Sequence, residues 1–175
     1  MKSVILILAT IFSLSGEANV KLVESEIKFS ATGKPSFIKA NGSVPLVETN
    51  LEFGTSEISG TAIVDLNKLD SGIELRDEHL KEKYLHTKKF PEAIIVFNKQ
   101  KVNFGKRNRL KAVLNFHGKK NEIILDAEFK KNGKIVTLHS GFEFLLTDFG
   151  VELPSFQGIT AADKVKINVV ASFEL

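Results

Sequence analysis

The sequence predicts an all-β protein, an antiparallel eight-stranded barrel with a short helical insertion. From Val20 onward, apolar and polar residues alternate with a period of two, which is typical of strands with one apolar and one polar face. Turn-forming residues separate these segments, and consecutive hairpins with one apolar face indicate an antiparallel meander. Closing such a meander into a barrel pairs its two edge strands.

The alternation is clearest in the second half of the chain. Three segments carry an apolar residue at every second position: residues 110–116, 123–129 and 165–173. Turn residues at 117–121 join the first two of these segments. A second turn follows at 131–134, where Asn132-Gly133 favours a tight hairpin because both residues tolerate a positive φ.

One segment departs from this pattern, between a strand that ends near Leu66 and a strand that starts near Ala93. Residues 74–85 are rich in helix formers and contain i,i+4 pairs such as Leu80 and Tyr84. Proline then blocks continuation of the helix. A short helix inserted in a barrel connection typically covers one end of the barrel.

The N-terminus has the features of a secretory signal peptide. A positively charged start precedes an apolar run, Val4–Leu14, of the length of a signal-peptide core. Small residues favour cleavage after Ala18, with cleavage after Ser15 as the alternative. The run is shorter than the roughly 20 residues that span a bilayer, and an uncleaved anchor is the competing interpretation. We therefore predict a signal peptide at 1–18, a domain at 19–175 and a periplasmic or secreted location.

Nearly all aromatic residues of the chain are phenylalanine. The chain has 14 Phe, one Tyr and no Trp. Because phenylalanine has no polar atom, it suits an interior that offers no hydrogen-bond partners. A barrel of about eight strands either fills with its own side chains or holds one small ligand. Neither composition nor periodicity decides between these outcomes.

Several classes of function are disfavoured. Without cysteine, disulfides, thiol chemistry and an acylated lipoprotein anchor are excluded. The densest basic cluster, Lys99–Arg109, is more typical of a solvated hairpin end than of a nucleic-acid-binding stripe. His79 and His86 could share a metal, but a surface role is favoured, and we expect His117 and His139 to be solvated. No nucleophile motif is present, so we predict a binding protein with no catalytic residue, metal site, required cofactor or nucleic-acid partner.

Arg76-Asp77 stands out at the start of the predicted helix. Asp77 is favoured there by the helix dipole, and Arg76 held against a carboxylate would pin the insertion to the barrel mouth. In the alternative interpretation, Arg76 or His79 hydrogen-bonds the polar head of a ligand. The structural interpretation is the favoured one.

Residues 69–97 carry a series of short motifs in a defined order. These are Ser71-Gly72, Arg76-Asp77, His79-Leu80, Phe90-Pro91 and a strand ending in Phe97. Together with residues 114–119 and 147–151, the series resembles the signature of the YceI-like family of exported lipocalin-like proteins. The chain departs from the family pattern at 145–147, where the family often has an arginine, and over 33–55.

The resemblance implies a lipid-like chain, a polyisoprenoid or isoprenoid quinone, held in a central apolar tunnel for transport or sequestration. Burying each methylene contributes about 0.8 kcal/mol, so a long tail can bind with almost no polar contacts. A long-chain lipid is thus the expected ligand and partner, with transient membrane contact and a homodimer left open. The alternatives are an enzyme acting on a bound lipid through His79 and Asp77, and a stress-related barrel with a solid core.

The apolar faces of the strands supply the candidate ligand-binding residues. Which face points inward is inferred from apolarity. The candidates are Ile27, Phe29, Ile95, Phe97, Leu114, Phe116, Leu125, Phe129, Val136, Leu138, Phe142, Phe144, Ile167 and Val169, with Arg76 and His79 at the mouth.

Overall fold

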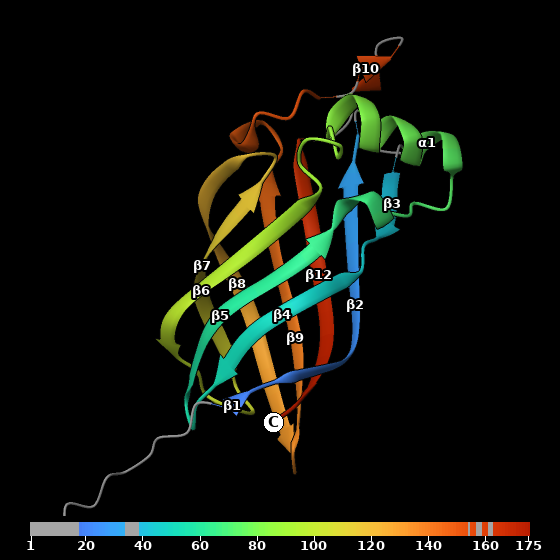
Figure 1. The fold of residues 1–175 in the computed structure, drawn as a ribbon. Coiled ribbons are helices and arrows are strands. Elements are labelled where there is room, and N and C mark those ends of the chain that lie inside the picture. The colour runs from blue at the N-terminus through green and yellow to red at the C-terminus, as the bar shows by residue number, and fades with distance from the viewer. Residues whose placement is uncertain (1–17, 34–38, 154, 157–158, 161–162) are drawn as a thin grey trace, which may run out of the picture.

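A computed structural model of the chain describes residues 18–33, 39–153, 155–156, 159–160 and 163–175. An antiparallel sheet of ten strands curls around a central axis (Figure 1). In order across the sheet, its strands are β1 (Ala18–Asn19), β4 (Leu46–Phe53), β5 (Glu57–Asp65), β6 (Glu92–Lys101), β7 (Arg107–Phe116), β8 (Lys119–Asn132), β9 (Ile135–Leu145), β12 (Lys164–Glu174), β2 (Lys21–Thr32) and β3 (Lys39–Ser43). A separate ribbon pairs β10 (Ser155–Phe156) with β11 (Ile159–Thr160). No helix in the part of the chain described here is long and apolar enough to cross a membrane.

The predicted antiparallel barrel with a helical insertion is confirmed, although the number of strands differs. Eight strands of the sheet, all except β1 and β3, have eight residues or more. The short strand β1 pairs with β4. The chain then crosses to the other side of the sheet, where β2 pairs with β12. At the crossing, the Val20 N–H donates to the Leu51 carbonyl at 3.3 Å. This contact brings the two sides of the sheet together at the lower end of Figure 1, where the chain ends.

Two tight hairpins connect β7, β8 and β9. Residues 117–118 both have positive φ, 50° and 76°, as a type I′ turn requires. In the next hairpin Asn132 is still paired with Ile135, so the loop is Gly133-Lys134. The Asn-Gly prediction therefore placed this turn one residue early. Gly133 supplies the positive φ of 60°, as a two-residue turn with glycine at its first position requires.

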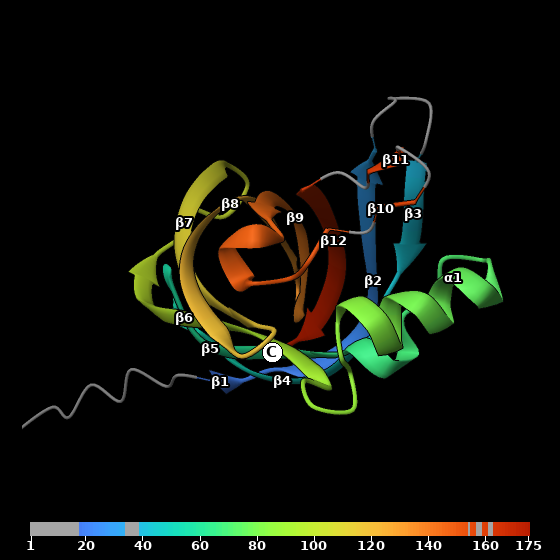
Figure 2. The ribbon, with the colours of Figure 1, turned by 90° about the horizontal axis from the view of Figure 1, so that it is seen from above.

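The insertion between β5 and β6 forms the helical part of the molecule. It comprises η1 (Leu66–Lys68), α1 (Glu74–His79) and η2 (Leu80–Tyr84), a single π-helical turn. The helix predicted over 74–85 is therefore present, with a change of helical type after His79. Both views place α1 beside the β2–β3 hairpin, at the upper end of the barrel (Figures 1 and 2).

A phenylalanine cluster closes the upper end of the barrel. The 3₁₀ turn η3 (Thr147–Phe149) lies over the opening when the barrel is seen from above (Figure 2). Its Phe149 is 1% exposed and packs edge-on against Phe116 and Phe144, with ring centroids 5.6 and 5.4 Å away. Such edge-to-face pairs are favourable beyond the area they bury.

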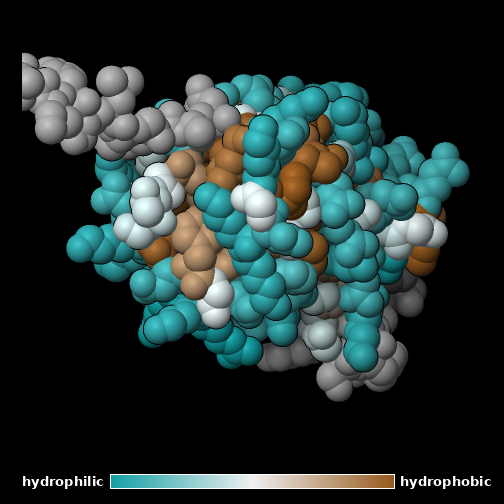
Figure 3. Space-filling model, turned by 90° about the horizontal axis from the view of Figure 1, so that it is seen from below, coloured by the Kyte–Doolittle hydropathy of each residue, from teal (hydrophilic) through white to brown (hydrophobic). Residues whose placement is uncertain are grey.

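A second cluster fills the lower end. Phe129 packs against Phe53 and Phe104, with ring centroids 5.7 and 6.1 Å apart, and Phe53 also contacts Phe173 at 5.8 Å. Seen from below, hydrophilic residues cover much of this end, with hydrophobic residues visible between them (Figure 3). Phenylalanine side chains thus pack together at both ends of the barrel.

Candidate functional site

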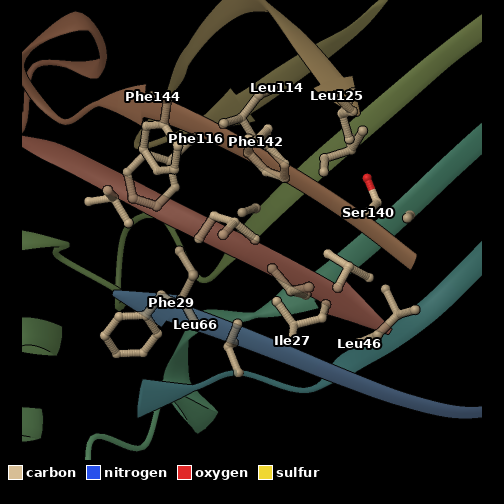
Figure 4. Close-up of a pocket in the computed structure, with 18 of the residues that line it drawn as sticks. Ile27, Phe29, Leu46, Leu66, Leu114, Phe116, Leu125, Ser140, Phe142 and Phe144 are labelled. Carbon is tan, nitrogen blue, oxygen red and sulfur yellow. The ribbon is translucent and has the colours of Figure 1, made fainter. Parts of the chain in front are cut away.

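The barrel contains an apolar cavity of about 220 Å³, part of which is shown in Figure 4. Every one of the eight long strands contributes side chains to its wall. Among the described residues that line it, none is charged, and only Ser140 and Tyr84 carry a polar side-chain atom. The Ser140 hydroxyl is already used, because it donates to the Asp126 carbonyl at 3.1 Å.

Leaving this volume empty would cost the protein stability. A site for one water needs about 10–15 Å³, so a cavity of about 220 Å³ is far larger than a packing defect. At about 24 cal/mol per Å³, an empty cavity of this size would cost about 5 kcal/mol. That is comparable to the whole stability of a small domain. Water is a poor filler because the wall offers few polar partners, so the geometry favours an apolar occupant.

The structure brings most of the predicted ligand-binding residues together around this cavity. Thirteen of them line it: Ile27, Phe29, Ile95, Phe97, Leu114, Phe116, Leu125, Phe129, Leu138, Phe142, Phe144, Ile167 and Val169. Figure 4 labels seven of them on different strands of the barrel: Ile27, Phe29, Leu114, Phe116, Leu125, Phe142 and Phe144. Their contact with a ligand stays a prediction.

Val136 lies below the cavity rather than in its wall. It shares the inward face of β9 with Leu138 but is paired with Phe173 and is 0% exposed. The predicted set left out many lining residues. Among them are alanines such as Ala127, which lay on the predicted apolar face, and the residues of β4, Leu46 and Leu51. Others come from the insertion and include Leu80 and Tyr84.

Arg76 and Asp77 clamp the turn before α1 instead of facing the cavity. The guanidinium donates from Nε to the Ser71 hydroxyl at 2.8 Å and from Nη2 to the Ser71 carbonyl at 2.7 Å. The buried Asp77 carboxylate accepts the Ser71 N–H at 2.9 and 3.1 Å. The predicted pairing of Arg76 with a carboxylate at the barrel mouth is therefore wrong: its two short hydrogen bonds stay within the insertion, and only the 3.5 Å contact from Nη1 to the Lys39 carbonyl reaches the sheet. His79 also lies outside the cavity wall, and its role at the mouth stays a prediction.

His117 lies half-buried in the β7–β8 turn, above the cavity, so the expectation that it is solvated is wrong. Its Nδ1 is 3.2 Å from the Phe149 carbonyl, which can only accept, so Nδ1 carries the proton. The ring centroid lies 4.6 Å from that of Phe90 and 5.7 Å from that of His86. Its Nε2 is buried and has no hydrogen-bond partner among the residues that the structure describes. Burial lowers the pKa of His117, and the hydrogen bond to Phe149 opposes this effect.

Comparison with known proteins identifies the family. The sequence matches the profile of the YceI-like domain over residues 19–173. The chain belongs to the YceI-like family. The resemblance found in residues 69–97 is therefore confirmed. Among curated protein sequences, no relative matches this YceI-like chain.

Solved structures share the YceI-like fold. BcnA of Burkholderia cenocepacia superposes with a TM-score of 0.73 at 17% identity, over 85% of this chain and 95% of BcnA. A polyisoprenoid-binding domain from Saccharophagus degradans, implicated in plant cell wall breakdown, gives 0.65 at 15% identity, over 89% of this chain and 97% of that domain. The Campylobacter jejuni YceI protein gives 0.57 at 14% identity, over 100% and 99% of the two chains. At these identities the likeness shows the fold alone.

The inward face of β8 can be tested with two adjacent residues. Leu125 is 3% exposed and lines the cavity, whereas Ile124 is 43% exposed on the outer face. Leu125→Asp places a carboxylate among apolar side chains and should lower the free energy of unfolding by about 3 kcal/mol or more. Ile124→Asp should change it by less than about 1 kcal/mol. Chemical denaturation measures both variants, and equal losses would show that the inward face is wrongly assigned.

The burial of His117 predicts a pH dependence of stability. Its pKa in the folded protein lies below the ordinary 6.5, so the unfolded chain takes up the proton first. The contribution of His117 to the free energy of unfolding should therefore stay constant above about pH 6.5 and should decrease as the pH falls below this value. His117→Asn, which tolerates the positive φ, should reduce this slope between about pH 7 and 5. Exposed His139→Asn is the control, and an unchanged slope in His117→Asn would refute the assignment.

Proposed function

We propose that this protein binds one long-chain amphiphile, a polyisoprenoid or isoprenoid quinone, and carries or sequesters it outside the cytoplasm. The observation that carries this proposal is a cavity walled almost entirely by carbon, to which all eight long strands contribute. The polyisoprenoid-binding domain of Saccharophagus degradans, which has the same fold, supports the chemical class of the ligand.

The dimensions of the cavity suit a chain rather than a compact molecule. On β9 alone the lining residues run from Leu138 to Phe144, about 20 Å of strand at roughly 3.4 Å per residue. A volume of about 220 Å³ spread over such a length is narrow. Ten methylene-sized groups buried there would contribute about 8 kcal/mol. Apolar burial by itself can therefore support binding, before the cost of ordering the ligand.

The alternative functions have less support. A cavity of this size argues against a barrel with a solid core. His79 and Asp77, the residues considered for catalysis, lie outside the cavity wall, and the Asp77 carboxylate is engaged by Ser71. In the described part of the chain, no group of three or more His, Cys, Asp or Glu could hold a metal. Binding is therefore the function we propose.

Lipid extraction tests the proposed cargo. Protein comprising residues 19–175 should release about one isoprenoid lipid per chain into organic solvent, as identified by mass spectrometry. Ala127→Leu adds volume inside the cavity and should reduce the recovered lipid in protein that still unfolds cooperatively. Ile124→Phe adds volume on the outer face of the same strand and should leave it unchanged. Wild-type protein that is empty and binds no added geranylgeraniol would contradict the proposal.

The location outside the cytoplasm rests on residues 1–18, of which 1–17 lie outside the described residues. The family match begins at residue 19, immediately after the proposed signal peptide. Full-length chain expressed in a bacterial host should appear in the periplasm with Asn19 at its N-terminus, or Gly16 if cleavage follows Ser15. Leu8→Arg interrupts the apolar run and should leave precursor in the cytoplasm. Wild-type protein that stays cytoplasmic with residue 1 intact would refute export.

A further inference from the structure

On one side, the cavity wall includes residues from outside the eight long strands. The strand β3 is an edge of the sheet, and in the described part of the chain it pairs with β2 and, through Ser43 alone, with Asp70 of the insertion. The insertion between β5 and β6 lies along this side, beside the β2–β3 hairpin (Figure 2). Both contribute to the cavity wall: Phe29, Ala31 and Ala40 come from the hairpin, and Leu80 and Tyr84 come from η2. We call the space between these five residues the lateral portal.

The two axial ends offer a ligand less room. At the upper end, Phe149 is 1% exposed beneath η3 and packs on the rings of Phe116 and Phe144. At the lower end, Phe129 and Phe173 are each 1% exposed. All five portal residues are half-buried. The hairpin is joined to the insertion by the two backbone hydrogen bonds between Ser43 and Asp70, at 2.8 and 2.9 Å. Nearer the start of β3, a longer contact of 3.5 Å runs from Arg76 Nη1 to the Lys39 carbonyl.

Tyr84 is the polar group of this portal. It is the only tyrosine in the chain, it is half-buried, and it lines the cavity. Its hydroxyl takes part in none of the hydrogen bonds made among the described residues. It is also not fully buried, since His117 Nε2 is the one fully buried side-chain nitrogen or oxygen among the described residues that lacks a partner. Tyr84 therefore brings a donor without a protein partner to an otherwise apolar set of lining residues.

The charges of the portal bear on the kind of head group that fits. No charged side chain lines the described cavity wall. Arg76, the cation that bridges toward β3, already donates from Nε and Nη2 to Ser71. An anionic head would thus find no cation among the described lining residues, whereas a neutral oxygen needs a single donor, which Tyr84 supplies. A buried anion without a paired charge is strongly disfavoured.

We propose that the ligand threads its tail through the lateral portal and leaves an uncharged oxygen, a hydroxyl or carbonyl, hydrogen-bonded to Tyr84. This inference rests on the proposed function and narrows its ligand to isoprenoid alcohols or quinones, as opposed to prenyl diphosphates. The tail provides affinity, and Tyr84 distinguishes between head groups.

Tyr84→Phe removes the hydroxyl and keeps the ring that forms the cavity wall. Binding is measured with three probes that share a skeleton: geranylgeraniol, the corresponding hydrocarbon and geranylgeranyl diphosphate. Wild-type protein should bind the alcohol most tightly. Tyr84→Phe should weaken alcohol binding about 3- to 10-fold, the value of one neutral hydrogen bond, and leave hydrocarbon binding unchanged.

The outcomes separate this inference from the proposed function. Equal changes for alcohol and hydrocarbon, no change for either, or tightest binding of the diphosphate by wild-type protein would overturn the role of Tyr84 while the lipid-binding function stands. Failure of wild-type protein to bind any of the three probes would refute the proposed function itself.

The route of access is tested by labelling, because the chain has no native cysteine. A bulky maleimide on Ala40→Cys, at the lateral portal, should abolish uptake of geranylgeraniol. The same label on Asp148→Cys, in η3 at the exposed upper end, should leave uptake intact. Loss of uptake with the η3 label alone would place access at the upper end and overturn the lateral portal.

Discussion

The cavity depends on a mismatch between the circumference of the barrel and the volume of the side chains inside it. Eight long strands set the width of a barrel, and this width does not shrink when inward residues are small. Alanine occupies inward positions on β5, β8 and β12, at Ala62, Ala127 and Ala171. Phenylalanine does the opposite at both ends, where clustered rings fill the same width. Small residues on the wall and large residues at the ends together produce a container.

The insertion between β5 and β6 solves a second problem, the unpaired edge at β3. An exposed edge strand invites unwanted pairing, and here Ser43 and Asp70 exchange backbone hydrogen bonds of 2.8 and 2.9 Å across it. The clamp of Arg76 and Asp77 on Ser71 then fixes the start of α1. Polar residues that resemble head-group ligands in the sequence therefore hold the start of the helix, and it is Leu80 and Tyr84 further along the insertion that line the cavity. The hydrogen bonds of Arg76 and Asp77 to Ser71 hold the fold of the insertion.

Alternation was sufficient to predict thirteen of the residues that line the cavity. A strand has only two faces, so the apolar face of β7 or β9 identifies its inward residues without knowledge of its neighbours. The same rule places Val136 on the correct face but does not give its depth, because depth depends on where Phe129 and Phe173 close the barrel. The register of the second hairpin likewise depended on pairing of Asn132 in the folded sheet.

Sequence patterns did not predict the contacts between segments that are distant in the chain. The burial of His117 depends on Phe90 and Phe149, which meet it only after the barrel has closed. Similarly, the pairing of Leu80 with Tyr84 predicted a helix, but it did not reveal that the same two side chains face the cavity. Patterns of period two or 3.6 report the faces of single elements. Sites formed between elements require the assembled structure.

Affinity and selectivity have different physical origins in such a cavity. Apolar burial is non-directional and grows with the area removed from water, so a wall of leucine, isoleucine and phenylalanine accepts any chain that fits its length. A hydrogen bond is directional and distinguishes between ligands that have the same tail. With the Ser140 hydroxyl engaged by Asp126, discrimination falls to the phenol of Tyr84. One hydrogen bond of this kind adds selectivity without adding much to the total affinity, because apolar burial supplies most of it.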